Sequence, residues 1–281
     1  MKKITILLAF VLTLFSCTTD QDLTLEQIEE TGIKKEQLLS AKTAPNVQLL
    51  KAWSQYSFYR GFNTYSRHFK VKVANIAPEK SVSVYHERLD GQWVEIPMEY
   101  SYSIDAQSEI WTLQYQHTGE KIYSDEFVIK YDVAGNTYWD DNNGEDYWLD
   151  QNEGTLLPEN GKNILVDDTF DGFFPVYNTD LKQLNIVVDL KNLALEKSAQ
   201  VVYSTDGWQS QGTFPLIYTN SWRIGYSYGI QSPNRFDVER WTGSIRVPNT
   251  VNAVEYAVVY RVNGEEYWDN NYGKNYLVSS N

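Results

Sequence analysis

The sequence predicts an all-β protein of two tandem antiparallel β-sandwich (immunoglobulin-like) domains behind a short N-terminal helical or disordered tether. Three observations predict this: short runs of alternating apolar and polar residues, Gly-containing turns between the runs, and a long stretch of sequence that occurs twice. The 281 residues leave room for two ordinary domains. About a hundred residues per copy suits a β-sandwich.

The N-terminus predicts an export signal at residues 1–17. Two lysines precede an apolar run from Ile4 to Phe15, which is shorter than the roughly 20 apolar residues that cross a bilayer. Cys17 is the single cysteine of the chain, so no intrachain disulfide can form. With a leucine three positions before it, Cys17 resembles the bacterial lipobox cysteine that becomes acylated. We expect an exported protein, lipid-anchored through Cys17 to a bacterial membrane, with the outer membrane favoured; an ordinary cleaved signal is the alternative.

Residues 18–45 predict a tether between the signal and the first domain. Acidic and basic residues alternate there, and Leu25 and Ile28 recur at a helical interval, but Gly32 interrupts the pattern. We therefore expect this segment to be helical or partly disordered.

The rest of the chain predicts two copies of one module, at residues 46–150 and 160–281, with a linker at 151–159. The stretch "EFVIKYDVAGNTYWDDNNGEDYWL" from Glu126 corresponds to "EYAVVYRVNGEEYWDNNYGKNYLV" from Glu255, at an offset of 129 in the numbering. The linker has the polar, Gly- and Pro-containing composition of a loop. Each copy shows the alternation typical of strands, and the turns "VAGN" and "VNGE" suit tight hairpins.

Earlier blocks of the two copies correspond at smaller offsets. The offset is 117 between Asn75 and Asn192, and it is 115 between Trp93 and Trp208. The rise from 115 to 129 predicts an insertion in the second copy, in the loop around "NSWRIGYSYGIQSPNRFDVER".

Composition narrows the possible partners. The formal net charge of −13 repels phosphate backbones and speaks against nucleic acid. The 9 Trp and 21 Tyr make the chain rich in flat, amphipathic rings, some of which can be displayed to a ligand.

The second copy places four candidate binding residues together: Trp208, Trp268, Asn270 and Asn275. An exposed indole can stack on the C–H face of a sugar, and an Asn side chain both donates and accepts hydrogen bonds, as each sugar hydroxyl does. Gly273 would let the loop curl back toward Trp268. The alternative is a hairpin whose Trp faces the core and whose Asp-Asn-Asn only makes the bend. The pattern alone leaves both open.

Two stretches of the second copy resemble carbohydrate-binding module family 21, the starch- and glycogen-binding modules of fungal glucoamylases and of glycogen-targeting phosphatase subunits. They are "EYAVVYRVNGEEYWDNNYGKNY" and "KNLALEKSAQVVYSTDGW". The resemblance implies that Trp208 and Trp268 stack on glucose and that Asn270 and Asn275 bind its hydroxyls. It implies α-glucan (starch, glycogen or malto-oligosaccharides) as the partner, with the membrane contacted through the lipid.

In the first copy "ANIAPEKSVSVYHERLDGQW" matches the same family block. The corresponding site residues are Trp93, Trp139, Asp141 and Asp146, so aspartates replace both asparagines. A carboxylate only accepts hydrogen bonds. The first copy therefore departs from the family at the residues that select the ligand, and we expect its sugar binding to be weaker, altered or lost.

Rival functions fit the sequence less well. "DDNNGED" lacks the spacing of an EF-hand calcium loop, since Gly144 is fifth and Gln151 twelfth when Asp140 is counted as first; an irregular calcium site stays open. We predict no catalytic residue, metal site or cofactor, because the three histidines lack metal-ligand spacing and no nucleophile or phosphate-loop motif occurs.

Two alternative functions remain, a structural or protein-interaction lipoprotein and a subunit resembling the glycogen-targeting regulators. For the latter, no convincing phosphatase-docking motif is found.

Overall fold

The computed structural model describes residues 45–167, 172–223 and 227–280. The predicted export signal, Cys17 and all but the last residue of the predicted tether lie outside these residues. The regular secondary structure of the described part consists of β-strands and one 3-10 turn (η1, Asn142–Gly144), which confirms the all-β prediction. It contains no helix long and apolar enough to span a membrane.

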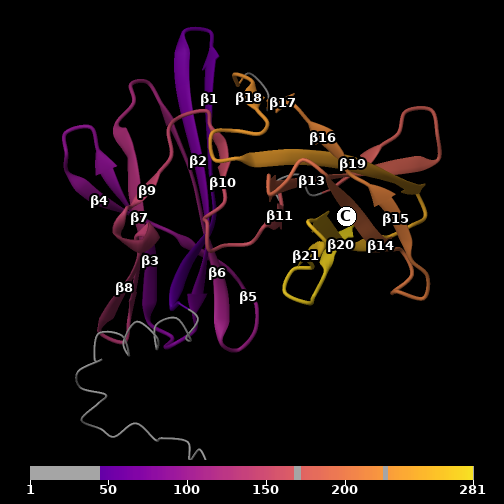
Figure 1. Cartoon of the computed structure of the whole chain (residues 1–281), viewed down its shortest axis with the longest axis horizontal. Coiled ribbons are helices and arrows are strands. Elements are labelled where there is room, and N and C mark those ends of the chain that lie inside the picture. Colours follow the sequence, from indigo (N-terminus) through magenta and orange to yellow (C-terminus); the bar gives the residue numbers. More distant parts are fainter. Residues whose placement is uncertain (1–44, 168–171, 224–226, 281) are drawn as a thin grey trace, which may run out of the picture. The chain divides into compact units, whose positions relative to one another are not determined.

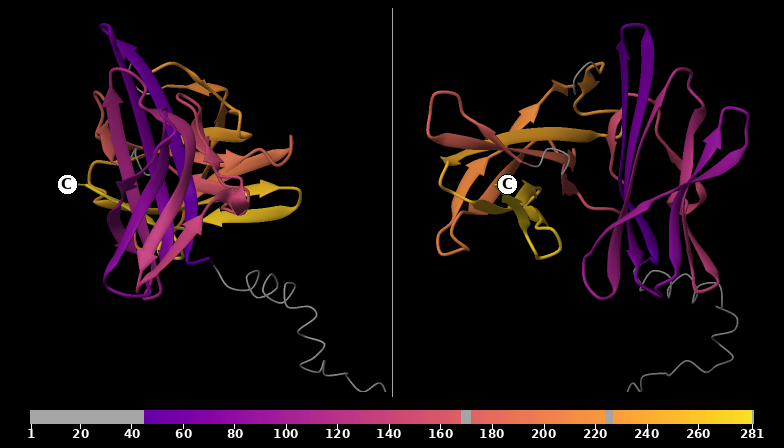
Figure 2. Two further views of the ribbon diagram at one scale, coloured as in Figure 1. Left: turned by 90° about the vertical axis from the view of Figure 1, so that its left-hand side faces the viewer. Right: turned by 180° about the vertical axis from the view of Figure 1, so that it is seen from behind.

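The strands of the first half cover residues 47–156. They are β1 (Val47–Tyr59), β2 (Phe62–Ala74), β3 (Lys80–Arg88), β4 (Trp93–Pro97), β5 (Glu99–Ser103), β6 (Ser108–Thr118), β7 (Tyr123–Val133), β8 (Asn136–Asp140), β9 (Tyr147–Trp148) and β10 (Gly154–Leu156). Sheet A has the order β10–β1–β2–β6–β5, and sheet B has the order β4–β3–β7–β8 with β9 also paired to β7. Figure 1 shows β1 and β2 as a long indigo hairpin, and Figure 2 shows it from two other sides.

The strands of the second half cover residues 164–279. They are β11 (Ile164–Val166), β12 (Phe173–Pro175), β13 (Leu181–Lys191), β14 (Lys197–Ser204), β15 (Gly212–Pro215), β16 (Ile217–Thr219), β17 (Ser221–Trp222), β18 (Ile230–Gln231), β19 (Val238–Pro248), β20 (Ala253–Val262), β21 (Glu265–Asp269) and β22 (Tyr276–Ser279). Sheet C has the order β11–β13–β19–β16 with β12 beside β13. Sheet D has the order β15–β14–β20–β21 with β22 beside β20, and β17 and β18 pair with each other.

Each half has a core to which both of its sheets contribute. In the first half Val71 and Phe69 of sheet A pack with Val84 and Ile129 of sheet B. In the second half the core includes Ile186 and Val188 of sheet C and Val201, Val258 and Tyr260 of sheet D. Alternate residues on these strands point inward, which is the period-2 pattern that predicted them. Burial of this apolar area is the main stabilising contribution to each half.

The two halves repeat individual contacts as well as strand order. The Tyr131 hydroxyl donates to the Ala74 carbonyl at 2.6 Å, and the equivalent Tyr260 donates to the Lys191 carbonyl at 2.9 Å. In the first half Lys80 forms an ion pair of 2.9 Å with Glu109, which also accepts from an indole N–H, that of Trp111. In the second half Lys197, Glu239 and Trp241 make the same set of contacts.

Strand register corrects one predicted correspondence. His86 lies opposite Val94 on β4, whereas Tyr203 lies opposite Gly212 on β15. Val94 and Gly212 are thus equivalent, so Trp93 corresponds to Gln211 and not to Trp208. Simple matching of the tryptophans failed because the loop before β15 differs in length from the one before β4.

The same register revises the predicted insertion. The offset in numbering is 118 between Val94 and Gly212, and it is 130 between the equivalent residues Glu109 and Glu239. These two offsets therefore indicate an insertion slightly shorter than the one predicted from the rise in offset from 115 to 129. The small β17–β18 sheet lies in this segment, within the loop in which the insertion was predicted.

A buried histidine gives the first half a pH-dependent stability. His86 is fully buried, and Arg67 Nη1 lies 2.6 Å from its Nε2. Because the guanidinium can only donate, Nε2 must accept, and Nδ1–H then donates to the Glu87 carbonyl at 3.0 Å. Burial and the charge of Arg67 lower the pKa of His86 to about 3. The imidazole is therefore neutral in the folded protein throughout the physiological range.

We expect His86 to weaken the fold as the pH falls from about 6.5 toward 3. In this pH range His86 binds a proton in the unfolded chain but not in the folded chain. The free energy of unfolding therefore falls by about 1.4 kcal/mol for each pH unit. His86→Gln retains an acceptor for Arg67 and should flatten this slope, while the matched variant His117→Gln should not. Urea unfolding between pH 7 and 4 measures it. Equal slopes for wild type and His86→Gln would contradict the assignment.

Candidate functional site

The outer face of sheet D carries Trp268. Val258 and Tyr260 of β20 point into the core, so Val259 between them faces away from it. Trp268 on β21 lies opposite Val259 in the strand register, while its neighbour Tyr267 packs against the core. The Trp268 side chain is 45% exposed. The alternative in which this tryptophan fills the core does not hold.

Carboxylates on the same sheet hold the two indoles of the second half. Trp268 Nε1 donates to Glu266 at 3.2 Å, and Trp208 Nε1 donates to Glu255 at 2.5 Å. Glu255 and Val259 share the outer face of β20, four residues apart, which corresponds to about 13 Å along a strand. Trp208 is 37% exposed, so both rings are available on one face.

The loop that carries Trp208 is fixed by its own short side chains. Ser204 Oγ accepts from the Trp208 backbone N–H at 2.9 Å and donates to Asp206 at 2.8 Å. Asp206 in turn accepts from the hydroxyl and the backbone N–H of Ser210, and these contacts hold the pKa of Asp206 at about 2. Trp208 has a φ of 66°, a left-handed conformation that is uncommon for a bulky residue. The sequence gives no indication of this backbone conformation.

The loop after Trp268 curls back as predicted. The carbonyl of Asn270 accepts from the N–H groups of Gly273 at 3.1 Å and Asn275 at 2.8 Å. Gly273 has a φ of 86°, which glycine adopts at low cost. The Asn270 side chain also accepts from Gly273 N–H at 2.9 Å, so its oxygen is used inside the loop. Its amide N–H groups remain for a ligand, while no described residue hydrogen-bonds the Asn275 side chain.

Beneath this loop lies Asp269, which the sequence analysis did not single out. It is fully buried and accepts from the Tyr276 hydroxyl at 2.7 Å, the Val166 N–H at 2.8 Å and the Lys162 ammonium at 2.6 Å. It thereby fastens the site loop to β11. The sequence carried a signal for this residue, because the same Trp-Asp pair occurs as Trp139-Asp140 and as Trp268-Asp269.

The first half builds the same loop with aspartates. Asp141 accepts from Gly144 N–H through its carbonyl at 3.1 Å and its side chain at 3.0 Å, and Asp146 N–H donates to the Asp141 carbonyl at 2.8 Å. Below it, Asp140 accepts from Tyr147 at 2.8 Å and from the Leu49 N–H at 2.6 Å. Within the loop the side chain at position 141 only accepts a hydrogen bond, so either Asp or Asn can make this contact with the backbone N–H of Gly144.

The electrostatics of the first loop differ from those of the second. Burial, together with the charge of Asp141, raises the pKa of Asp146, and burial raises that of Asp140. In the parts of the chain that the structure describes, no group of three or more His, Cys, Asp or Glu side chains is placed to hold a metal ion.

Aromatic rings also line the outer face of sheet B. Trp139 is 44% exposed, and Tyr85 lies between it and Trp93, with ring centroids 5.5 Å and 5.4 Å away. Lys130 sits over the Trp139 ring at 5.9 Å. The structure thus joins Trp93 and Trp139 through Tyr85, which the sequence analysis missed.

Comparison with known proteins gives a match over the second half. Residues 176–279 match the model of the carbohydrate/starch-binding module (family 21). Human protein phosphatase 1 regulatory subunit 3B is 32% identical over 96 residues, which are 32% of this chain and 30% of that protein. The bovine protein of the same name is 33% identical over 106 residues, or 36% of this chain and 34% of that one. The chain thus spans about a third of the length of these relatives.

Two solved structures are also similar. One is the starch binding domain of Rhizopus oryzae glucoamylase in complex with β-cyclodextrin and maltoheptaose. It is 32% identical to this chain with a TM-score of 0.29, and the match covers 39% of this chain and 96% of that one. The other is the carbohydrate binding module of the muscle glycogen-targeting subunit of protein phosphatase 1, with 24% identity, a TM-score of 0.28, and coverage of 44% and 84%. The segment that matches carbohydrate/starch-binding module family 21, residues 176–279, contains Trp208, Trp268, Asn270 and Asn275.

Proposed function

We propose that this protein binds α-glucan (starch, glycogen or malto-oligosaccharides) on the outer face of sheet D and does not cleave it. The observation that carries the proposal is the exposed Trp268 beside the Asn270–Asn275 loop, within the segment that matches the family. Trp268 and Trp208 stack on glucose rings, and the amides of Asn270 and Asn275 bind hydroxyls. The rings are held in place before the ligand arrives, which lowers the entropic cost of binding.

Native gels that contain glycogen or amylopectin test this proposal. We expect the polysaccharide to retard the protein, and we expect no increase in reducing ends when the two are incubated together. Unchanged mobility would contradict the binding, while release of reducing ends would contradict the non-catalytic role.

We further propose that the two halves are tandem copies of one immunoglobulin-like module. The shared loop geometry and the repeated Lys-Glu-Trp contacts support this. Two sites on one chain would raise the apparent affinity for a polymer by about 10² to 10⁴ if both can engage it. Cys17 and the preceding apolar run support a lipid-anchored, exported protein on a bacterial membrane.

The first-half site is expected to be limited by its aspartates. Because the loop needs only an acceptor at position 141, Asp141→Asn together with Asp146→Asn should keep the loop and add amide donors. In a Trp268→Ala chain, where the second-half site is disabled, we expect this double substitution to increase retardation by glycogen. Adding Trp139→Ala should remove the gain. No gain from the double substitution would show that the carboxylates are not what limits this site.

The relatives that regulate protein phosphatase 1 suggest a second role, glycogen targeting of an enzyme. The family match covers residues 176–279, so it supports the glucan partner and gives no support for phosphatase docking. An immobilised-protein assay with protein phosphatase 1 separates the two, and we expect glycogen alone to bind.

A further inference from the structure

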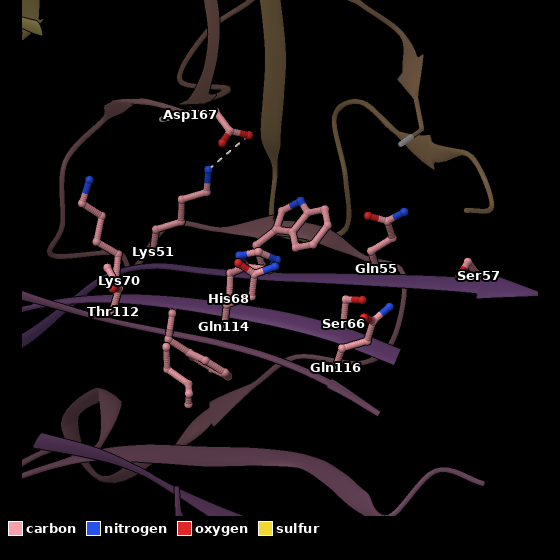
Figure 3. A pocket seen from close by; sticks show the side chains of 13 residues that line it. Lys51, Gln55, Ser57, Ser66, His68, Lys70, Thr112, Gln114, Gln116 and Asp167 are labelled. Carbon is pink, nitrogen blue, oxygen red and sulfur yellow. Dashed lines mark ion pairs between the residues drawn. The ribbon is translucent and has the colours of Figure 1, made fainter. Parts of the chain in front are cut away.

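A groove of about 540 Å³ lies on the outer face of sheet A, away from the Trp268 site. Its floor is formed by strands β1, β2 and β6, on the side opposite the core residues Ala52 and Val71. The volume is within the range of about 300–1,000 Å³ found for small-molecule sites. Figure 3 shows the labelled polar side chains standing on one side of these strands.

The lining side chains form cross-strand rows. The central row contains Trp53, His68 and Gln114, and the next row contains Gln55, Ser66 and Gln116. Rows on one face of a sheet follow each other at about 7 Å. The groove therefore offers hydrogen-bonding groups at regular intervals along the strands.

Four of the six side chains in these two rows are amides or hydroxyls, which carry no charge. Amides and hydroxyls, which both donate and accept hydrogen bonds, occupy the middle of the groove. At one end Lys51 lies 2.9 Å from Asp189 and 3.6 Å from Asp167, so its charge is compensated. A neutral polyhydroxyl compound can use the mixed donors and acceptors of these rows.

Two glutamine side chains of the groove are open to a ligand. Gln114 and Gln116 are exposed, and no described residue hydrogen-bonds their amides. Trp53 is only 7% exposed and forms part of the groove wall. The His68 ring meets the Trp53 ring edge-on at 4.8 Å and fixes its position.

We propose that this groove is a further carbohydrate site that takes a short, neutral oligosaccharide in contact with Gln55, Gln114 and Gln116. It differs from the Trp268 site in kind, because the ligand lies in a polar groove instead of on an exposed aromatic face. That its sugar is a piece of α-glucan rests on the proposed function of the Trp268 site.

Calorimetric titration of the full chain carrying Trp268→Ala tests the groove, with maltotriose and cellotriose as probes. We expect maltotriose to bind, and we expect Gln114→Leu with Gln116→Leu to weaken binding at least about tenfold. The matched control is Gln107→Leu, an exposed glutamine in the β5–β6 turn, which should leave the affinity unchanged. Thermal unfolding of each variant shows that the fold is kept.

The outcomes separate the groove from the Trp268 site. Binding of cellotriose but not maltotriose would keep the groove as a neutral-sugar site and overturn its assignment to α-glucan. Binding of neither, or binding that the double substitution leaves unchanged, would overturn the proposal. Retardation of the wild type by glycogen depends on Trp268 and is measured independently, so failure of one site does not imply failure of the other.

Discussion

Replacing Trp268 by alanine is expected to abolish most of the retention of this protein by glycogen. The indole is held by Glu266 at 3.2 Å and is 45% exposed on the outer face of sheet D, so it supplies a preorganised stacking surface. Truncating an aromatic residue that dominates a binding site costs about 2 kcal/mol or more, or roughly 30-fold in affinity. The measurement is the dissociation constant from mobility in gels of increasing glycogen concentration.

Trp139→Ala is the matched control for this prediction. Trp139 is 44% exposed, precedes a loop with the same backbone hydrogen bonds, and differs mainly in the aspartates beside it. Its loss should cost less than the loss of Trp268. Equal and negligible effects of both substitutions would contradict sugar binding at either indole, and a larger effect of Trp139→Ala would reverse the assignment of the principal site.

The largest expected effect on stability comes from Asp189. This carboxylate is 1% exposed and accepts two hydrogen bonds from Arg240, at 2.8 Å and 2.9 Å. It also accepts from Thr155 at 2.7 Å and pairs with Lys51. Asp189→Asn leaves Asp167, 2.6 Å from Arg240, as the remaining carboxylate beside this buried arginine, and we expect a loss of about 3 kcal/mol in the free energy of unfolding. Urea unfolding at pH 7 measures this, with the exposed Glu196→Gln as control.

The stabilisation by Asp189 is expected to decrease as the pH falls. Burial alone would raise the pKa of Asp189, but the charges of Arg240 and Lys51 and the hydrogen bonds lower it below its ordinary value. The stabilisation by the charged carboxylate is therefore complete above about pH 4 and is lost as the pH falls further. The difference between wild type and Asp189→Asn should shrink below pH 4. A difference under about 1 kcal/mol at pH 7 would show that the ion pair adds little.

The internal repeat made much of the fold and of the candidate loop predictable. The alternating residues of β20 and the Asn-Gly turn after it gave the hairpin, and Gly273 gave the curled loop, because these features depend on neighbours in the sequence. The exposure of Trp268 was left open between core and surface. It became clear only from the strand register, which places this residue opposite Val259.

Features that depend on distant residues were not predictable. Asp269 looked like part of a bend, yet it is buried because Val166 and Lys162, far earlier in the sequence, meet it. The equivalence of Trp93 and Trp208 was wrong because sequence matching does not weigh strand pairing. The groove on sheet A also went unnoticed, since its rows join residues from three strands that are polar and individually ordinary.

The most direct test of α-glucan binding is an array of immobilised glycans probed with the purified protein. We expect signals on glycogen, amylopectin and malto-oligosaccharides that fall strongly in Trp268→Ala and less in Trp139→Ala. Signals confined to glycans without α-linked glucose, or no signal on any glycan, would contradict α-glucan binding.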